Sequence, residues 1–136
     1  MRKVDHVGIA VKSIDVSIDY YIHTLGLTLL AVEEVPSQNV RVAFIDAGNI
    51  KLELLEPLGE DGAIAKFIEK RGEGVHHIAF GVIDIRSRMD ELREKGVQLL
   101  QEEPKIGAGG AEVAFLHPKS SFGVLYELCD KSGKGD

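Results

Sequence analysis

Four side chains that could bind a metal ion stand inside otherwise apolar segments of the sequence. His6 and His77 lie in the similar segments V-D-H-V-G-I-A-V and V-H-H-I-A-F-G-V. Glu53 and Glu127 each precede a leucine, in L-E-L and Y-E-L. Two imidazole nitrogens and two carboxylate oxygens suit a divalent first-row metal ion, and an octahedral ion would keep two positions for water or substrate. A bound ion of this kind would stabilise negative charge that develops on a substrate.

Each of these residues taken alone has a simpler interpretation. A single histidine in an apolar strand is more often part of the core than a ligand, and a glutamate between leucines often faces solvent. The four gain weight from an internal repeat, because V-D-H-V-G-I-A-V recurs 71 residues later and places His6 on His77. Three further residues in the second half bring Glu53 onto Glu127, at an offset of 74. If the halves pack about a pseudo-twofold axis, the four donors converge, and a cation would offset the cost of burying two carboxylates.

The repeat also decides between two adjacent histidines. Successive side chains of a strand point to opposite faces, so His76 and His77 cannot share one role. His77 is the partner of His6 in the repeat, whereas His76 aligns with Asp5. We therefore expect His77 to be the ligand and His76 to serve in packing or at the surface.

A helix is predicted after the first strand of each half. Ser13 and Asp84 are the predicted N-caps, and Gly26 and Gly96 are the predicted glycines that end the helices. Apolar residues at helical spacing predict the buried faces, which are Ile14, Ile18, Tyr21, Ile22 and Leu25 in the first helix and Ile85, Met89 and Leu92 in the second. Strand-like segments follow these helices at residues 27–32 and 97–100.

These elements predict an α+β fold made of two βαβββ modules related by pseudo-twofold symmetry. The first module spans about residues 4–58 and the second about residues 75–130. A linker helix at about residues 61–72 joins them, and the whole chain, residues 1–136, is expected to be one domain.

Composition excludes several classes of partner. The 136 residues carry a net charge of −6, and the pI is near 5.4, so the chain lacks the basic surface that nucleic-acid binding needs. No apolar run approaches the roughly 20 residues of a membrane-spanning helix. Without a signal region at its start and with one cysteine, Cys129, the chain is expected to be cytoplasmic. Nothing near Cys129 in the sequence favours a reactive thiol.

Several longer segments carry a resemblance to a known family. They are D-H-V-G-I-A-V, N-I-K-L-E-L-L-E-P-L-G, G-V-H-H-I-A-F, K-I-G-A-G-G-A-E-V-A-F-L-H-P-K-S and G-V-L-Y-E-L. With them the chain resembles the vicinal oxygen chelate (glyoxalase/bleomycin resistance/dioxygenase) superfamily, and over nearly its whole length it is similar to the methylmalonyl-CoA epimerases. The resemblance implies one divalent metal ion per chain, with cobalt the most effective activator and Mn, Ni, Zn, Fe or Mg as alternatives. The implied ligands are His6, Glu53, His77 and Glu127, and the implied assembly is a homodimer.

The resemblance implies an acyl-CoA thioester substrate, methylmalonyl-CoA, whose two C2 epimers interconvert through an enolate. Inversion at C2 needs a base on one face of the carbon and an acid on the other. Some epimerases of this family carry a catalytic glutamate at the position of Val42, and valine cannot move a proton. We therefore expect Glu53 and Glu127 to be the catalytic pair.

An anionic substrate also needs local positive or hydrogen-bonding groups on this acidic chain. The segments K-I-G-A-G-G and K-S-S-F-G supply candidates. Lys105 and Lys119 could contact carboxylate or phosphate groups. Gly109 and Gly110 would let backbone N–H groups approach an anion.

Other functions remain open at this level. A glyoxalase I-type lactoylglutathione lyase would use the same four donors, and a metal-free ligand-sequestering protein of the same fold would need none of them. The segment A-G-G-A-E-V-A-F-L-H-P-K favours the epimerase, and no arginine arrangement indicates a glutathione site. Dioxygenases that hold iron through two histidines and one glutamate fit less well, because Glu53 would fill the position that oxygen needs. Retention of all four donors in register argues against simple sequestration.

Overall fold

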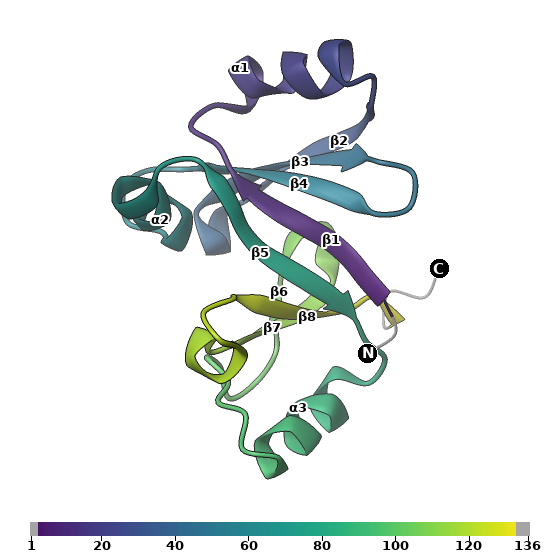
Figure 1. The fold of residues 1–136 in the computed structure, drawn as a ribbon, viewed down its shortest axis with the longest axis vertical. Coiled ribbons are helices and arrows are strands. Elements are labelled where there is room, and N and C mark those ends of the chain that lie inside the picture. The colour runs from purple at the N-terminus through teal and green to yellow at the C-terminus, as the bar shows by residue number, and fades with distance from the viewer. Residues whose placement is uncertain (1–2, 133–136) are drawn as a thin grey trace. The chain divides into compact units, whose positions relative to one another are not determined.

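The computed structural model describes residues 3–132, which form two compact units (Figure 1). One unit contains residues 6–76, and the other contains residues 77–132 together with residues 3–5. No helix among the described residues is long and apolar enough to cross a membrane.

The strands of the unit that contains residues 6–76 follow one another in the order β2-β3-β4-β1. Their bounds are β1 Lys3–Ala10, β2 Thr28–Val35, β3 Val40–Asp46 and β4 Lys51–Pro57. Neighbouring strands run antiparallel from β2 to β4, while β4 and β1 run parallel. This parallel pairing puts the strand that carries His6 beside the strand that carries Glu53.

The second unit repeats this arrangement with the strand order β5-β8-β7-β6. Its strands are β5 Gly74–Gly81, β6 Lys105–Ile106, β7 Glu112–Leu116 and β8 Tyr126–Asp130. The pair β5 and β8 is parallel, and the other pairs are antiparallel. Each unit therefore has the order strand, helix and three strands, which confirms the predicted α+β class and its βαβββ modules.

Within residues 3–132, three α-helices accompany these strands. They are α1 Ile14–Asp19, which continues as the π-helical segment η1 Tyr20–Thr24, α2 Ala63–Arg71, which lies in the predicted linker, and α3 Ile85–Glu94. Short 3₁₀ segments are η2 Pro36–Gln38, η3 Ala108–Gly110 and η4 Pro118–Ser121.

The predicted helix ends are confirmed. The Ser13 hydroxyl accepts a hydrogen bond from the Val16 N–H, and the Asp84 carboxylate accepts one from the Ser87 N–H. These bonds satisfy N–H groups that the first turn of a helix leaves without an intrahelical partner. Gly26 and Gly96 follow the helices with φ angles of 77° and 91°, a conformation that glycine adopts without strain.

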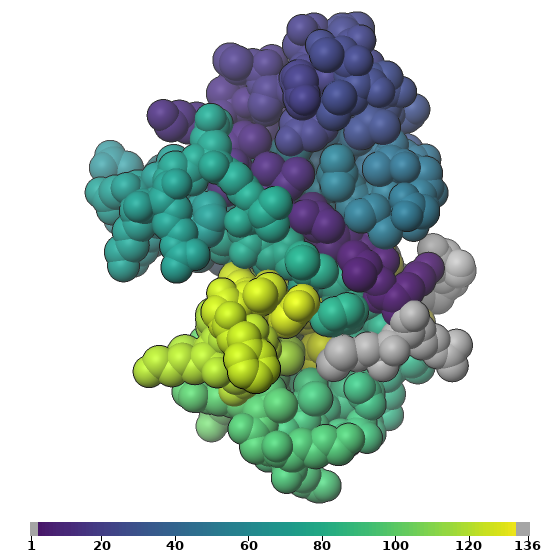
Figure 2. All heavy atoms as spheres, viewed as in Figure 1, coloured from purple at the N-terminus to yellow at the C-terminus, as the bar shows by residue number. Residues whose placement is uncertain are grey.

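Each module buries the inner face of its first helix against its own sheet. The cluster in the first module consists of Val11, Ile14, Ala43, Ile45 and Leu54, with Ile18 and Tyr21 packed against it. The cluster in the second consists of Val82, Ile85, Met89, Ala114, Leu116 and Leu128, with Leu92 packed against it. The opposite faces of α1 (purple) and α3 (green) form part of the surface in Figure 2.

The predicted buried position of Leu25 is wrong. Its side chain is 48% exposed, although Ile14, Ile18 and Tyr21 lie on the buried side as predicted. The cause is the π-helical segment, in which the Leu25 N–H donates to the carbonyl of Tyr20, five residues earlier. This wider turn rotates the residues that follow it away from the 3.6-residue period used for the prediction.

The predicted strand at residues 97–100 is also wrong. Only an isolated bridge between Leu99 and Leu116 forms there, and the strand beside β7 is the two-residue β6. The side-chain oxygen of Gln101 accepts the hydrogen bond of the Phe115 N–H at 2.8 Å. A side chain thus takes the place of a backbone carbonyl, so the ladder along β7 is interrupted before β6 begins.

Candidate metal and acid–base site

In the first module, His6 and Glu53 form a buried pair. Gly8 pairs with Glu53 across the parallel β1–β4 ladder. His6 lies two residues before Gly8 on β1 and therefore faces the same side as Glu53. The His6 Nδ1 is 3.3 Å from the Glu53 Oε2. Phe44 of β3 pairs with Glu53 from its other side, so an aromatic residue stands next to the carboxylate.

In the second module, His77 and Glu127 form the corresponding pair. Ala79 pairs with Glu127 across the parallel β5–β8 ladder, and Phe115 pairs with it across the antiparallel ladder. The His77 Nε2 is 3.5 Å from the Glu127 Oε1. The rings of His77 and Phe115 meet edge to face, with their centroids 5.4 Å apart. The strand pairing thus reproduces the correspondence that the sequence repeat predicts.

All four side chains are nearly shielded from solvent. His6, Glu53, His77 and Glu127 are 3%, 7%, 6% and 6% exposed, respectively. A buried carboxylate is costly unless a positive charge or a metal ion accompanies it. Two ligands that each lie about 2.1 Å from one ion are themselves separated by about 3.0–3.4 Å, depending on the coordination angle. The His6–Glu53 distance of 3.3 Å lies within this range, and the His77–Glu127 distance of 3.5 Å lies just above it.

The packing role predicted for His76 is seen in the structure. Its ring meets the ring of Phe67 on α2 edge to face, with the centroids 5.0 Å apart. Because β5 alternates its side chains, this contact lies on the face opposite to His77. His76 therefore packs against a helix.

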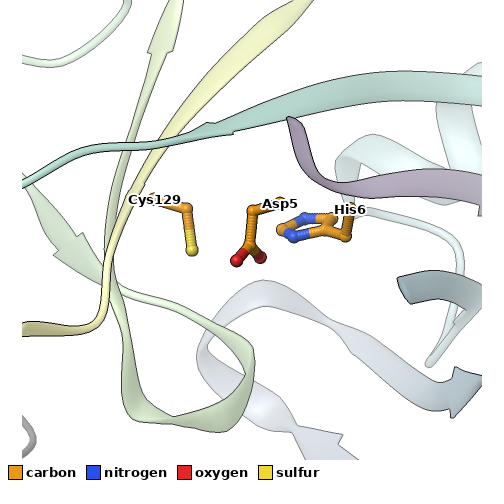
Figure 3. A group of neighbouring side chains, drawn as sticks. All are labelled: Asp5, His6 and Cys129. Carbon is orange, nitrogen blue, oxygen red and sulfur yellow. The ribbon is translucent and has the colours of Figure 1, made fainter. Parts of the chain in front are cut away.

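Asp5 and Cys129 lie close together in the second unit, and Figure 3 draws them with His6, the residue that follows Asp5 on β1. The Asp5 carboxylate forms an ion pair with Lys131 at 3.1 Å. Cys129 is 4% exposed. A buried thiol next to a carboxylate is poorly placed to form a reactive thiolate, which agrees with the sequence interpretation of Cys129.

The candidate substrate contacts fall on two segments of the second unit. Lys105 is an exposed residue of β6, and Gly109 and Gly110 follow in η3 with φ angles of 70° and 77°. Lys119 lies in η4, where its backbone N–H donates to the Nδ1 of His117 at 3.0 Å. The structure thus groups Lys105 with the two glycines in one hairpin.

Sequence reasoning missed a second pair of repeated carboxylates. The Ile14 N–H donates to the Glu56 Oε1 at 2.8 Å, and the Ile85 N–H donates to the Asp130 Oδ2 at 3.0 Å. Glu56 and Asp130 differ by the offset of 74 that relates Glu53 to Glu127. Each holds the start of its module's first helix from the strand that carries the buried glutamate, and the recurring offset was the available signal.

The pKa of Asp130 reflects this role. Burial alone would raise the pKa of this carboxyl, but hydrogen bonds from Ser132 and from backbone N–H groups at the start of α3 bring the pKa below its ordinary value of 3.8. The carboxylate form of Asp130 is therefore stabilised in the folded protein.

Comparison with known proteins adds independent information. A family model described as the Glyoxalase/Bleomycin resistance protein/Dioxygenase superfamily matches residues 5–115. The ethylmalonyl-CoA/methylmalonyl-CoA epimerase of Cereibacter sphaeroides is 45% identical over 93% of this chain and 96% of its own. A Streptomyces coelicolor methylmalonyl-CoA epimerase variant in complex with 2-nitronate-propionyl-CoA has a TM-score of 0.90 and 41% identity, covering 96% of this chain and 97% of that one. A probable lactoylglutathione lyase of Synechocystis is 33% identical over 96% of this chain and 97% of its own.

Proposed function

The chain belongs to the Glyoxalase/Bleomycin resistance protein/Dioxygenase superfamily, and we propose that it is an enzyme, a methylmalonyl-CoA epimerase. The observation that carries the proposal is the pair of buried histidine–glutamate contacts at equivalent ladder positions of the two modules. Full-length similarity to epimerases at 45% and 41% identity supports this assignment over the lyase, for which the identity is 33%.

The proposal includes one divalent metal ion per chain, with His6, Glu53, His77 and Glu127 as its ligands. Cobalt is proposed as the most effective activator. Mn, Ni, Zn, Fe and Mg are alternatives, because this mixed set of nitrogen and oxygen donors suits several divalent ions. When bound, the ion would supply Lewis-acid stabilisation of the negative charge that develops on the thioester oxygen.

The proton transfers are assigned to Glu127 and Glu53. Removal of the C2 proton gives an enolate, and its return on the other face gives the opposite epimer, so one carboxylate acts as base while the other acts as acid. Both carboxylates are buried, so protons that they exchange with C2 would be shielded from bulk water. Val42 is fully buried and has no ionisable group, so the proposal assigns the second proton transfer to Glu53.

Incubation of one methylmalonyl-CoA epimer in deuterated water, followed by proton NMR at C2, tests the proposal. We expect the C2 signal to disappear with the wild-type enzyme and to persist for Glu127→Gln and Glu53→Gln, since loss of a general acid or base costs about 10²–10⁴-fold in rate. Glu69→Gln, a change at an exposed position of α2, is the matched control.

Two outcomes would contradict parts of this assignment. Absence of exchange with every added divalent metal would overturn the epimerase proposal, and parallel assay with the glutathione–methylglyoxal adduct would then test the lyase. Exchange at the wild-type rate in Glu53→Gln would remove Glu53 from the proton transfers. Metal content below about a tenth of an equivalent, with no activation by cobalt, would favour a metal-free sequestering protein.

Finer features of the proposal concern substrate contacts and assembly. Lys105, Gly109, Gly110 and Lys119 are proposed to contact the anionic groups of the acyl-CoA, because lysine side chains and glycine N–H groups bind anions. A homodimer is proposed, so sedimentation should give about twice the 14.8 kDa chain mass. We also propose a cytoplasmic location, since the sequence holds a single cysteine and no disulfide pair.

A further inference from the structure

The glycine-rich segment of the second unit is held as a short hairpin. Lys105 pairs with Val113 and Ile106 with Glu112, and these two register pairs are the whole β6–β7 ladder. The intervening residues, 107–111, contribute a hydrogen bond from the Gly107 N–H to the Ala111 carbonyl at 2.8 Å. A two-stranded hairpin this short is marginally stable by itself, so other contacts must hold its conformation.

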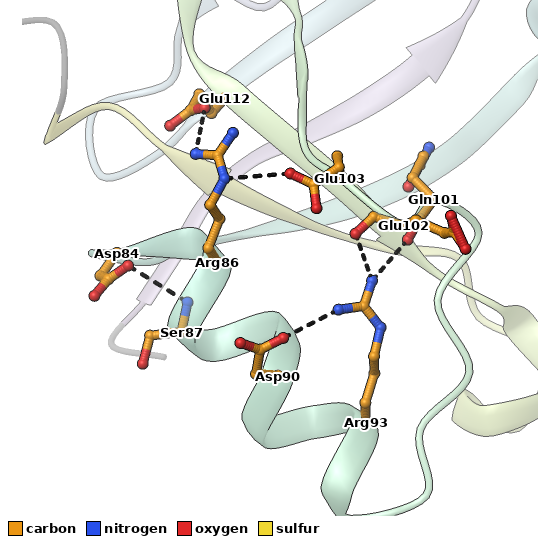
Figure 4. A network of polar contacts seen from close by, with 9 residues as sticks. All are labelled: Asp84, Arg86, Ser87, Asp90, Arg93, Gln101, Glu102, Glu103 and Glu112. Carbon is orange, nitrogen blue, oxygen red and sulfur yellow. Dashed lines mark hydrogen bonds and ion pairs between the residues drawn. The ribbon is translucent and has the colours of Figure 1, made fainter.

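Arg86 on α3 contacts both sides of this hairpin with one side chain (Figure 4). Its Nη1 is 3.2 Å from the Glu112 Oε2, and its Nε is 3.5 Å from the Glu103 Oε1. Glu103 precedes β6 and Glu112 begins β7, so the two carboxylates flank the glycine-rich segment in the sequence. A guanidinium suits this arrangement because its several N–H donors point in different directions from one rigid plane.

Arg93, two helical turns further along α3, holds the chain just before the hairpin. Its Nη2 donates to the carbonyls of Gln101 and Glu102 at 3.1 Å and 2.7 Å, as Figure 4 shows. Residues seven apart lie on the same helix face, so both arginines contact the connection between α3 and β6, residues 95–104. Its Nη1 is also 3.2 Å from Asp90 on α3 itself, which orients the guanidinium.

The same connection reaches the buried histidine–glutamate pair of this unit. The Gln101 side chain accepts the hydrogen bond of the Phe115 N–H, and Phe115 contacts His77 and pairs with Glu127. Displacement of residues 101–103 would therefore disturb both the hairpin and the strand that stands beside Glu127.

We propose that Arg86, supported by Arg93, is a positioning residue that sets the conformation of the hairpin at residues 104–111 for binding of the acyl-CoA substrate. The inference rests on the proposed function, because it assigns a substrate-binding role to that hairpin. The ion pairs are individually weak, since the side chains of Arg86 and Glu103 are 59% and 75% exposed. A small free energy from these ion pairs is nevertheless enough to favour one conformation of the hairpin, because the β6–β7 ladder itself has only two residue pairs.

Kinetics of Arg86→Gln measure the effect on substrate binding. We expect KM for methylmalonyl-CoA to rise roughly threefold to tenfold, in keeping with loss of two surface ion pairs, while kcat changes by less than about twofold. The KM of Arg86→Lys should lie between those of Arg86→Gln and the wild type, because an ammonium can pair with one carboxylate at a time. Lys95→Gln removes an equally charged, exposed side chain from the end of α3 and should leave KM unchanged.

Neutralising the partner carboxylate separates positioning from a general electrostatic effect. Loss of a positive charge weakens attraction of an anionic substrate, whereas Glu112→Gln reduces repulsion and should lower KM if charge alone matters. Positioning instead predicts that KM rises in Glu112→Gln as in Arg86→Gln. A fall of KM in Glu112→Gln would overturn the inference.

Hydrogen exchange provides a readout that does not depend on turnover. Amides of residues 105–111 should exchange roughly threefold faster in Arg86→Gln than in the wild type, whereas amides of α1 should be unaffected. Unchanged exchange in residues 105–111 would contradict the positioning role even if the epimerase activity is confirmed. Absence of epimerase activity in the wild type together with faster exchange in the variant would overturn the proposed function and the substrate role, while the structural contact would stand.

Discussion

His76 and His77 are neighbours in the sequence but differ in their surroundings. His77 lies 3.5 Å from a buried carboxylate, whereas His76 packs on Phe67. We expect His77→Ala to weaken divalent-metal binding by more than about 100-fold, because changes that only orient a ligand already cost 10–100-fold. His76→Ala should retain wild-type metal affinity. Metal analysis after dialysis without chelator measures both variants.

Loss of metal from a folded His76→Ala protein would contradict this assignment. Circular dichroism serves as the control, since removal of the His76 ring also deletes its contact with α2. A variant that keeps its helical signal but no longer retains metal would show that His76, and not only His77, belongs to the ligand set.

At the residue scale, the sequence allows candidate functional residues to be predicted where the same polar residue type recurs in both halves of the chain. His6, His77, Glu53 and Glu127 stand out because polar residues recur at equivalent strand positions, and the ladders place them as the repeat predicts. Arg86 and Arg93 could not be found in this way, because each contacts residues that are close in space only after the connection to β6 has folded. The partners of Arg93 include backbone carbonyls, which no sequence pattern reveals.

At the element scale, the helices are fixed to the strands that carry the buried glutamates. Asp130 lies on β8, three residues after Glu127, and its carboxylate accepts a hydrogen bond from the Ile85 N–H at the start of α3. We expect Asp130→Ala to lower the free energy of unfolding by about 2 kcal/mol at pH 7, as loss of a buried, charged hydrogen-bond acceptor does. Asp90→Ala changes an exposed position of α3, the helix whose first N–H Asp130 accepts. It should change the free energy of unfolding by less than about 0.5 kcal/mol.

The difference between Asp130→Ala and the wild type should depend on pH. The pKa of Asp130 is lowered in the folded state, so its stabilisation is complete above the ordinary value of 3.8 and is lost as the pH falls through the lower folded value. Urea unfolding at pH 7 and at pH 3 should therefore give a larger difference at pH 7. An equal difference at both values would mean that the charge of Asp130 does not contribute.

Element types and caps follow from local patterns, while element interruptions do not. Ser13 and Asp84 cap their helices as predicted, since a cap needs only residues within one turn. The π-helical segment that exposes Leu25 and the Gln101 side chain that interrupts the ladder on β7 depend on packing and on a distant strand. A prediction from hydrophobic periodicity assumes a regular backbone, so it cannot detect the π-helical segment or the interrupted ladder.

At the scale of the whole molecule, duplication divides the proposed ligand set equally. Each module supplies one histidine and one glutamate, and two donors alone leave most of a first-row ion's coordination shell to water. We therefore expect tight binding to require both modules and to reach one equivalent per 14.8 kDa chain. Titration with cobalt, followed by its visible absorption, measures the stoichiometry and the coordination geometry together.

Variants that remove one pair at a time test this dependence. His6→Ala with Glu53→Gln and His77→Ala with Glu127→Gln should abolish tight binding equally, because each leaves the same two kinds of donor. If either variant retained half of the bound cobalt at the original affinity, the modules would hold separate ions. Equal and complete loss, with folding preserved, would mean that neither module binds tightly without the donors of the other, which is the functional consequence expected of a duplicated chain that keeps both halves.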